Sequence, residues 1–224
     1  MHPPSGASFP IPGQFLNTTE TIDNFRGCNF TVGLLWDVDE KEENLLTLGL
    51  VYHTPFTAKM EREFDVVTSG GPVPFPQEDM DIDMPASLGA GVNYRISDAL
   101  SIAFDVEWKE WSKFKQKYAD GTLDSPYNSD TLAYRLGFEK LAFPGGLRES
   151  VFAYRGGLFY EPRPVLNYPD TLPVYGLSAG LGWTVPDQCS LDFAYQFRWG
   201  NEDVGDIDYD IEEHFFVGSL IIYF

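Results

Sequence analysis

The chain has 224 residues, and its 34 acidic and 15 basic side chains give a formal net charge of −19 at pH 7. This charge argues against a nucleic-acid partner, because binding to phosphates needs clustered Lys and Arg. Hydrophobic residues make up 43% of the chain, but no stretch approaches the roughly 20 consecutive apolar residues of a spanning helix, so a helical membrane protein is excluded.

The first 26 residues are expected to form an irregular segment, and the strands are assigned to residues 27–224. Met1–Pro10 has neither the basic nor the apolar part of a secretory signal. We therefore expect either that a signal has been removed or that the chain is a fragment.

Alternation of large apolar with small or charged side chains predicts β-strands along the rest of the chain. In Leu100–Trp108 the large apolar residues are even-numbered, and in Leu191–Trp199 they are odd-numbered. Successive side chains of a strand point to opposite faces, so each segment has one apolar and one polar face. About ten strands are predicted in this way, near residues 27–37, 44–53, 57–66, 84–96, 100–112, 130–140, 151–160, 174–184, 189–200 and 211–224. The range 57–66 has a thin apolar face and is included because the topology needs it.

These strands predict an all-β fold, an antiparallel transmembrane β-barrel, with a soluble sandwich as the alternative. Short and long connections alternate, as in outer-membrane barrels with short periplasmic turns and longer external loops. Residues 53–56 are predicted to be a short periplasmic turn, and the acidic residues 37–43 an external loop. Aromatic rings favour the membrane–water interfaces, so Trp and Tyr are expected at strand ends. The predicted map agrees: the external ends have Trp36, Trp108, Trp111 and Trp199, and the periplasmic ends have Trp183 and Tyr52.

Five short motifs follow one another in order along the chain: Met84–Tyr94, Asp105–Ser112, Gly157–Pro164, Leu172–Gly182 and the closing Tyr223–Phe224. With them the sequence resembles the FadL-type family of outer-membrane transporters for long-chain fatty acids and hydrocarbons, over roughly residues 30 to 224. The resemblance implies a fourteen-stranded barrel closed by an N-terminal hatch domain. This chain looks like the C-terminal ten strands of such a barrel.

Four cations on the inward parity are candidates for binding a fatty-acid carboxylate: Arg135, Arg155, Lys109 and Arg198. A carboxylate in a partly dry cavity needs a cation, because an unpaired buried charge is costly. Arg135 and Arg155 lie at mid-span, whereas the other two lie nearer the external rim. The alternative is that these cations only pair with the inward acids Asp105, Glu107, Glu139 and Asp192.

The sequence gives only weak indications of a disulfide, a metal site or a catalytic site. Cys28 and Cys189 are expected to be isolated small apolar residues, and the chain has no metal-ligand spacing. A barrel hydrolase with His214 and Asp210 as a dyad is one alternative, although no nucleophile is identified. We expect no enzyme activity, no cofactor and no metal.

The sequence therefore predicts facilitated diffusion of hydrophobic molecules, such as long-chain fatty acids or aromatic hydrocarbons, across the outer membrane of a Gram-negative bacterium. The expected partners are the hydrophobic substrate, outer-membrane lipids and lipopolysaccharide, around a monomeric barrel. A complete ten-stranded porin or structural barrel is the main alternative.

Overall fold

The structure is a computed structural model, and it describes residues 16–40, 45–68, 70–74, 78–118, 120–144, 150–204 and 207–223. These residues form β-strands and their connections, with one 3₁₀ turn at Trp111–Lys113. No helix within these ranges is long and apolar enough to cross a membrane. The predicted all-β, antiparallel class is confirmed, because every strand pairing in the described ranges is antiparallel.

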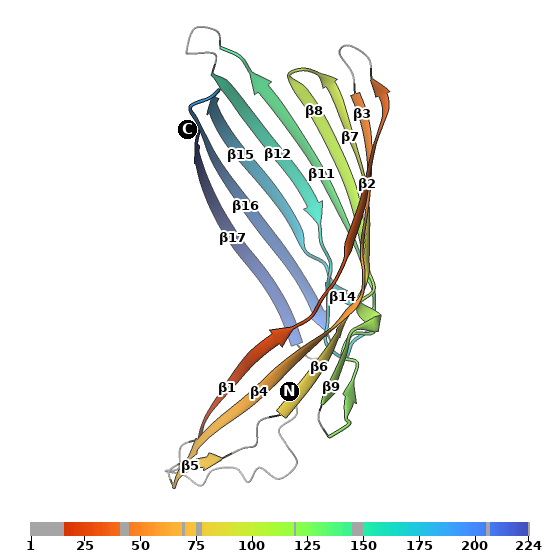
Figure 1. The fold of residues 1–224 in the computed structure, drawn as a ribbon, viewed down its shortest axis with the longest axis vertical. Helices are drawn as coiled ribbons and strands as arrows, with labels where there is room; N and C mark the ends of the chain where they lie inside the picture. The colour runs from red at the N-terminus through yellow and green to blue at the C-terminus, as the bar shows by residue number, and fades with distance from the viewer. Residues whose placement is uncertain are drawn as a thin grey trace. The chain divides into compact units, whose positions relative to one another are not determined.

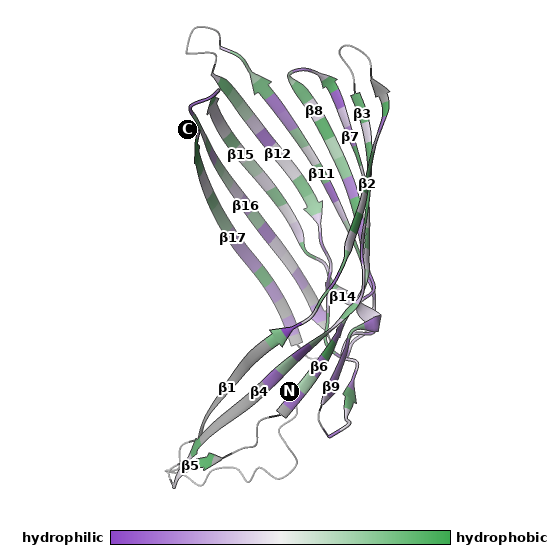
Figure 2. Ribbon diagram, in the orientation of Figure 1, coloured by the Kyte–Doolittle hydropathy of each residue, from purple (hydrophilic) through white to green (hydrophobic). Residues whose placement is uncertain are grey.

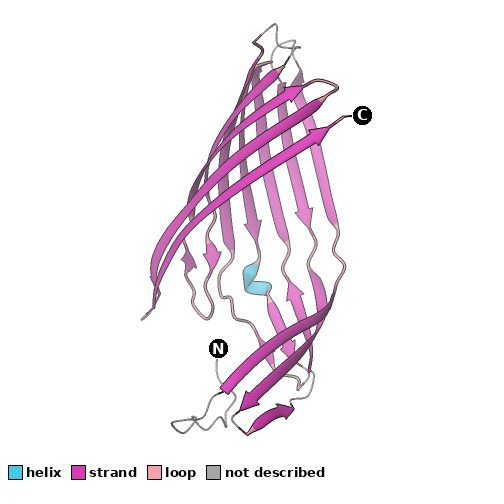
Figure 3. Ribbon diagram, turned by 90° about the vertical axis from the view of Figure 1, so that its left-hand side faces the viewer, coloured by secondary structure: helices cyan, strands magenta, loops and turns pink. Residues whose placement is uncertain are grey.

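The chain divides into two compact units. The larger unit contains a curved nine-stranded sheet (Figures 1 and 3) in the order β17-β16-β15-β12-β11-β8-β7-β3-β2. Its strands are β2 (Thr31–Glu40), β3 (Leu45–His53), β7 (Ser87–Ser97), β8 (Leu100–Lys109), β11 (Thr131–Ala142), β12 (Val151–Tyr160), β15 (Tyr175–Val185), β16 (Cys189–Val204) and β17 (Ile207–Ile222). Strands β2 and β17 form the two edges, each with one hydrogen-bonded neighbour among the described residues.

The smaller unit contains a second antiparallel sheet. Its strands are β1 (Leu16–Arg26), β4 (Phe56–Thr68), β6 (Glu78–Met84), β9 (Lys115–Tyr118) and β10 (Leu123–Asp124) in this order, with β5 (Gly71–Pro74) paired to β4. Strand β1 differs from the sequence prediction, which took this segment as irregular. Asp83 accepts hydrogen bonds from Lys117 and Thr57, both at 2.6 Å, and these bonds lower the pKa of its carboxyl group.

The nine strands of the larger sheet coincide with nine of the predicted ranges to within a few residues. The tenth prediction, a barrel strand at 57–66, is wrong, because these residues lie in β4 of the smaller unit. The predicted turn at 53–56 is also wrong. Strand β3 pairs with β2 and β7 and makes no hairpin with β4. The alternation of side chains identified a strand here correctly but could not show which sheet it joins.

The two ends of the larger sheet differ in their connections. We call the end with the β7–β8 and β15–β16 turns the turn end, and the opposite end, where β3, β8 and β12 finish, the loop end. Trp108, Trp111 and Trp199 lie at the loop end, and Trp183 lies at the turn end. The sequence analysis likewise placed the first three at one end of the strands and Trp183 at the other.

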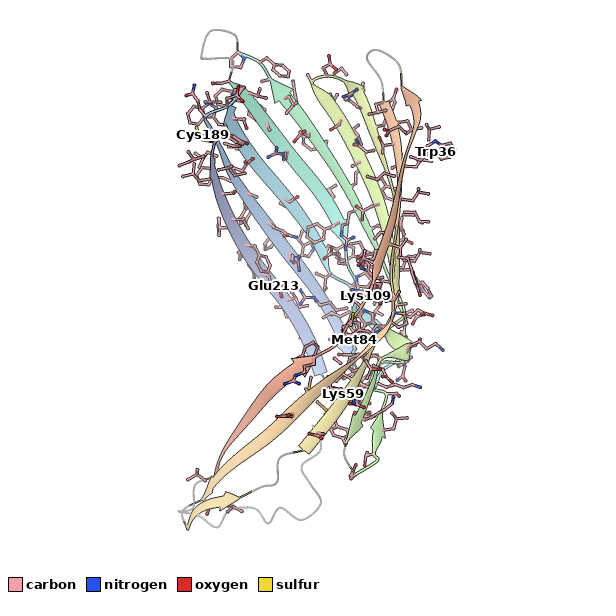
Figure 4. The ribbon with its side chains drawn as sticks, viewed as in Figure 1. Trp36, Lys59, Met84, Lys109, Cys189 and Glu213 are labelled. Carbon is pink, nitrogen blue, oxygen red and sulfur yellow. The ribbon has the colours of Figure 1, made fainter. Side chains whose placement is uncertain are left out.

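Two aromatic residues lie at the end opposite to the predicted one. Trp36 lies toward the turn end (Figure 4), and Tyr52 lies at the loop end, next to the last residue of β3. The acidic connection between β2 and β3 is likewise at the turn end, although residues 41–44 lie outside the described residues. Counting 57–66 as a barrel strand reversed the predicted direction of the two strands before it.

A close contact between neighbouring strands occurs at Gly176 of β15. The ring of Phe159 in β12 occupies the place where a Cβ atom on this glycine would lie. An aromatic ring laid over a strand glycine fills the space that the missing side chain leaves. The contact fixes the register of β12 against β15 on this face.

We expect Gly176→Ala to lower the free energy of unfolding by about 1–3 kcal/mol, because the added methyl group overpacks against Phe159. Urea unfolding of the protein in detergent micelles, followed by tryptophan fluorescence, measures this change. Gly33→Ala is the control, since its Cβ atom would meet no atom closer than 3.7 Å. Equal stability of the two variants would contradict the contact.

Candidate functional site

Hydrophobic and hydrophilic residues alternate along the strands of the larger sheet (Figure 2), so the sheet has one apolar and one polar face. On the apolar face large side chains are widely exposed, for example Leu158 at 60%, Leu181 at 58% and Phe193 at 59%. Exposed apolar surface on this scale is unusual in a soluble monomer and marks contact with another apolar medium. This face is therefore suited to hydrocarbon, and the opposite face is where polar side chains are concentrated.

A row of aromatic rings crosses the apolar face near the loop end. Tyr134, Tyr160, Tyr175 and Trp199 are cross-strand neighbours on β11, β12, β15 and β16. Their ring centroids lie 6.3, 5.2 and 6.2 Å apart in that order. Tyr and Trp favour the membrane–water interface, where an amphipathic ring contacts both lipid and headgroups. The residue types of this row, and its position near one end of the strands, are those expected of an aromatic belt at a membrane interface.

On the polar face, Arg135 of β11 lies at the centre of a cluster of carboxylates. Its Nε donates to Glu161 at 2.6 Å, its Nη1 to Asp105 at 2.9 Å and its Nη2 to Glu107 at 2.9 Å. Asp105 is its direct cross-strand partner on β8, and Glu161 follows β12. All three guanidinium nitrogens are thus used in charge-assisted hydrogen bonds, which are stronger than neutral ones.

A second cluster surrounds Arg155 of β12. Its Nε donates to Glu139 at 2.6 Å and its Nη1 to Asp192 at 2.7 Å. Glu139 is the cross-strand partner on β11, whereas Asp192 lies on β16, two strands away on the other side. The guanidinium therefore reaches across β15, where Gly182 leaves room for it, with Arg155 Nη1 3.1 Å from the Cβ position of this glycine.

The other two predicted cations have weaker partners. Lys109 Nζ lies 3.9 Å from Glu107 and 5.4 Å from the ring centre of Trp111. The Arg198 guanidinium lies 5.5 Å from the ring of Phe159 and 5.1 Å from that of Phe215. Its nitrogens are 3.8 Å from Glu161 and 4.0 Å from Glu213. All four predicted cations therefore share the polar face with carboxylates. Three of them contact acids that the pairing alternative named, whereas Arg198 lies near Glu161 and Glu213.

The sequence analysis missed Glu161 and Arg163, which lie in the connection after β12. Arg163 donates two hydrogen bonds to the Glu213 carboxylate of β17, at 3.0 and 2.8 Å. These bonds raise the pKa of the Arg163 guanidinium. The same connection forms the short hairpin of β13 (Arg163–Pro164) and β14 (Thr171–Leu172). Its buried residues Val165, Leu172 and Val174 pack against Tyr168 and Ile211. The connection was taken as an external loop, so its charges were not considered with the strands.

A hollow opens beside the Arg135 cluster on the polar face. Its volume is about 640 Å³, and it is lined by residues of β2, β3, β7, β8 and β11, among them Gly33, Leu35, Gly49, Val51, His53, Gly89, Gly91, Asp105, Glu107 and Arg135. This volume is within the range of roughly 300–1,000 Å³ that small-molecule pockets have. Strand pairing places Arg135, Asp105, Gly91, Gly49 and Leu35 in one cross-strand row. The glycines carry no side chain, so the hollow lies above them.

The polar and apolar parts of the hollow are separated. Asp105, Glu107 and Arg135 lie at one side, and Leu35 lies beyond Gly49 and Gly91. Val51 lies between Gly33 and Gly89, with its Cγ1 2.8 Å from the place of a Cβ atom on Gly89. Sequence reasoning missed this site, because it considered the inward charges and not the glycines of β2, β3 and β7. The cross-strand register aligns these glycines, and the register is not visible in the sequence. The run Gly89-Ala-Gly91 is the sequence feature that could have indicated the hollow.

The described residues contain no group of three or more His, Cys, Asp or Glu side chains placed to hold a metal ion. Cys28 and Cys189 are both free. His214 lies on the apolar face, where its Nδ1 is 2.8 Å from the Tyr195 hydroxyl and its Nε2 3.4 Å from Glu212. The predicted His214–Asp210 dyad therefore gains no support, since the contacts of this histidine are to other residues.

We expect Arg135→Gln to lower the free energy of unfolding by about 1–3 kcal/mol, because three converging carboxylates lose their shared cation. Lys109→Gln is the matched control. Its side chain is 38% exposed and its ammonium lies 3.9 Å from Glu107, so the loss of this charge changes stability by less than about 0.5 kcal/mol. Urea unfolding of both variants in the same detergent measures the difference, and equal effects would show that the Arg135 cluster adds no stability.

A comparison with protein families identifies one match. The sequence model of the family described as outer membrane protein transport protein (OMPP1/FadL/TodX) matches residues 10–207. No individually curated protein matches the chain. The match spans most of the described strands of both units, including β2 and β3, whose glycines lie below the hollow, and the charged residues of β8, β11 and β12.

Proposed function

The chain belongs to the outer membrane protein transport family (OMPP1/FadL/TodX), and we propose that it carries hydrophobic small molecules across the outer membrane by facilitated diffusion. The proposal involves no covalent step and no cofactor. Outer-membrane lipids and lipopolysaccharide contact the apolar face, and the protein acts as a monomer in the membrane of a Gram-negative bacterium. The aromatic row near the loop end supports this placement.

The observation that carries the proposal is the hollow on the polar face. A hydrophobic molecule that crosses a polar interior needs local apolar surface, because each apolar Å² removed from water contributes about 25 cal/mol. Gly33, Gly49, Gly89 and Gly91 supply space, and Leu35 and Val51 supply apolar contacts. A water-filled porin needs no such site, so the hollow favours a carrier of hydrophobic molecules over the porin alternative.

Arg135 belongs to the proposed binding site because its guanidinium lines the hollow. Arg155, Lys109 and Arg198 lie elsewhere on the polar face, and we propose that they line the rest of the pathway. Each of these cations has neighbouring carboxylates, and the strength of those ion pairs determines whether it can bind a substrate carboxylate. The family contains carriers of hydrophobic molecules, and the substrate of this chain is a separate proposal.

Filling the hollow tests this function. We expect Gly33→Phe to weaken binding and uptake of a neutral hydrophobic probe, 1-naphthylphenylamine, by about tenfold, because the new ring takes up part of the cavity. The backbone tolerates a side chain here, since a Cβ atom on Gly33 would meet no atom closer than 3.7 Å. Fluorescence of the probe in vesicles that contain the protein measures uptake.

Gly218→Leu is the matched control, because it adds a side chain on the opposite, apolar face, where the nearest atom to the new Cβ would be 3.6 Å away. Uptake by this variant stays at the level of the parent protein. Normal uptake by a folded Gly33→Phe variant would contradict the role of the hollow.

A further inference from the structure

Resting on the proposed function, we propose that the hollow selects neutral hydrophobic molecules and excludes carboxylates such as fatty-acid anions. The residues that determine this selectivity are Asp105 and Glu107, acting together with Arg135. This differs from the sequence prediction, in which Arg135 and Arg155 bind the carboxylate of a fatty acid.

The first step is that Arg135 is already engaged. Each of its three nitrogens donates to a different carboxylate, at 2.6 to 2.9 Å. These bonds use three of its five N–H groups. Three carboxylates nevertheless surround a single cation, so the cluster already has a formal charge of −2, which repels a further anion. The arginine is therefore a poor ligand for a further anion.

The second step is the charge that faces the hollow. Two carboxylates and one guanidinium line it, which gives a formal charge of −1 from Asp105, Glu107 and Arg135. The remaining acid of the cluster, Glu161, is also bound to Arg135. Like charges within a few Å repel, and the repulsion grows as water is displaced from the site. An anionic head group placed here meets more negative than positive charge.

Arg155 gives the same result at a second place. It lines a smaller hollow of about 260 Å³ with Asp192, and it donates to both Asp192 and Glu139. Two carboxylates again surround one guanidinium. At both arginines the carboxylates outnumber the guanidinium, so a substrate carboxylate meets an excess of negative charge.

A neutral molecule meets no such barrier. Its hydrocarbon part contacts the glycine backbone and the Leu35 and Val51 side chains, which carry no charge. A hydroxyl group at its end can donate a hydrogen bond to a free lone pair of Asp105 or Glu107, because an ionised carboxylate accepts several. The same acids that repel an anion thus tolerate an alcohol or an alkane.

Two ligands of equal chain length test the selectivity on the unaltered protein: dodecan-1-ol and dodecanoate at pH 8. Displacement of bound 1-naphthylphenylamine gives both affinities. We expect dodecan-1-ol to bind at least about tenfold more tightly, because an unpaired carboxylate loses its hydration in the hollow. Equal or tighter binding of dodecanoate would overturn the proposal while leaving transport of hydrophobic molecules intact.

The double variant D105N/E107Q tests the residues. It keeps the shape of both side chains, removes two negative charges, and releases Arg135 from two of its three ionic partners. We expect the ratio of its dodecanoate affinity to its dodecan-1-ol affinity to rise about tenfold, as a newly available guanidinium pairs with the anion. A folded double variant without this gain would show that these acids do not set the selectivity.

The triple variant D105N/E107Q/R135Q is the control, because it removes the released cation as well. Its dodecanoate affinity returns to the low level of the parent protein if Arg135 is the new ligand. If the double variant does not fold, the comparison of the two ligands on the parent protein still decides the proposal. Failure of a folded parent protein to bind either ligand or the probe contradicts the proposed function itself, and the selectivity proposal with it.

Discussion

The structure depends on one constraint, that the two faces of each strand meet different surroundings while its backbone stays hydrogen-bonded. Side chains alternate across a strand, so an apolar face toward hydrocarbon requires the other face to take nearly all of the charge. In the larger sheet this separation holds from β2 to β17 through eight antiparallel pairings in the described ranges. Backbone groups left unpaired in hydrocarbon cost several kcal/mol each, which makes pairing obligatory. The polar face is therefore where any binding site on this sheet has to form.

The charges gathered on this face are held together by hydrogen bonds between strands that are distant in sequence. Arg135 joins β8 to the residue that follows β12, and Arg155 joins β11 to β16 across two intervening strands. Arg163 adds a link from the β12–β15 connection to β17. Each guanidinium offers planar, directed donors, which explains why arginine and not lysine occupies these positions. The clusters hold the strands in register, and at Arg135 and Arg155 the carboxylates outnumber the cation that they share.

The sequence predicted the class of fold and nine strands of the larger sheet, because alternation is a local signal that each strand carries by itself. It also predicted that Asp105, Glu107, Glu139 and Asp192 share a face with Arg135 and Arg155. It failed where a pairing between distant residues decided the outcome. The segment 57–66 is a strand, but its partners β1 and β6 are in another sheet, and this one error reversed the predicted positions of Trp36 and Tyr52.

A hollow lined by glycines is hard to predict from a sequence, and this one shows why. Gly49 and Gly91 face each other directly, and Gly89 pairs with Val51, which pairs with Gly33. Each glycine alone resembles a strand residue that weakens its strand. A register shift of one residue would move them all to the apolar face, where they would leave gaps toward hydrocarbon. The pairing of β2, β3 and β7 aligns these glycines, and the pairing of β7 with β8 places the Arg135 cluster beside them, so the hollow depends on the register of all these strands.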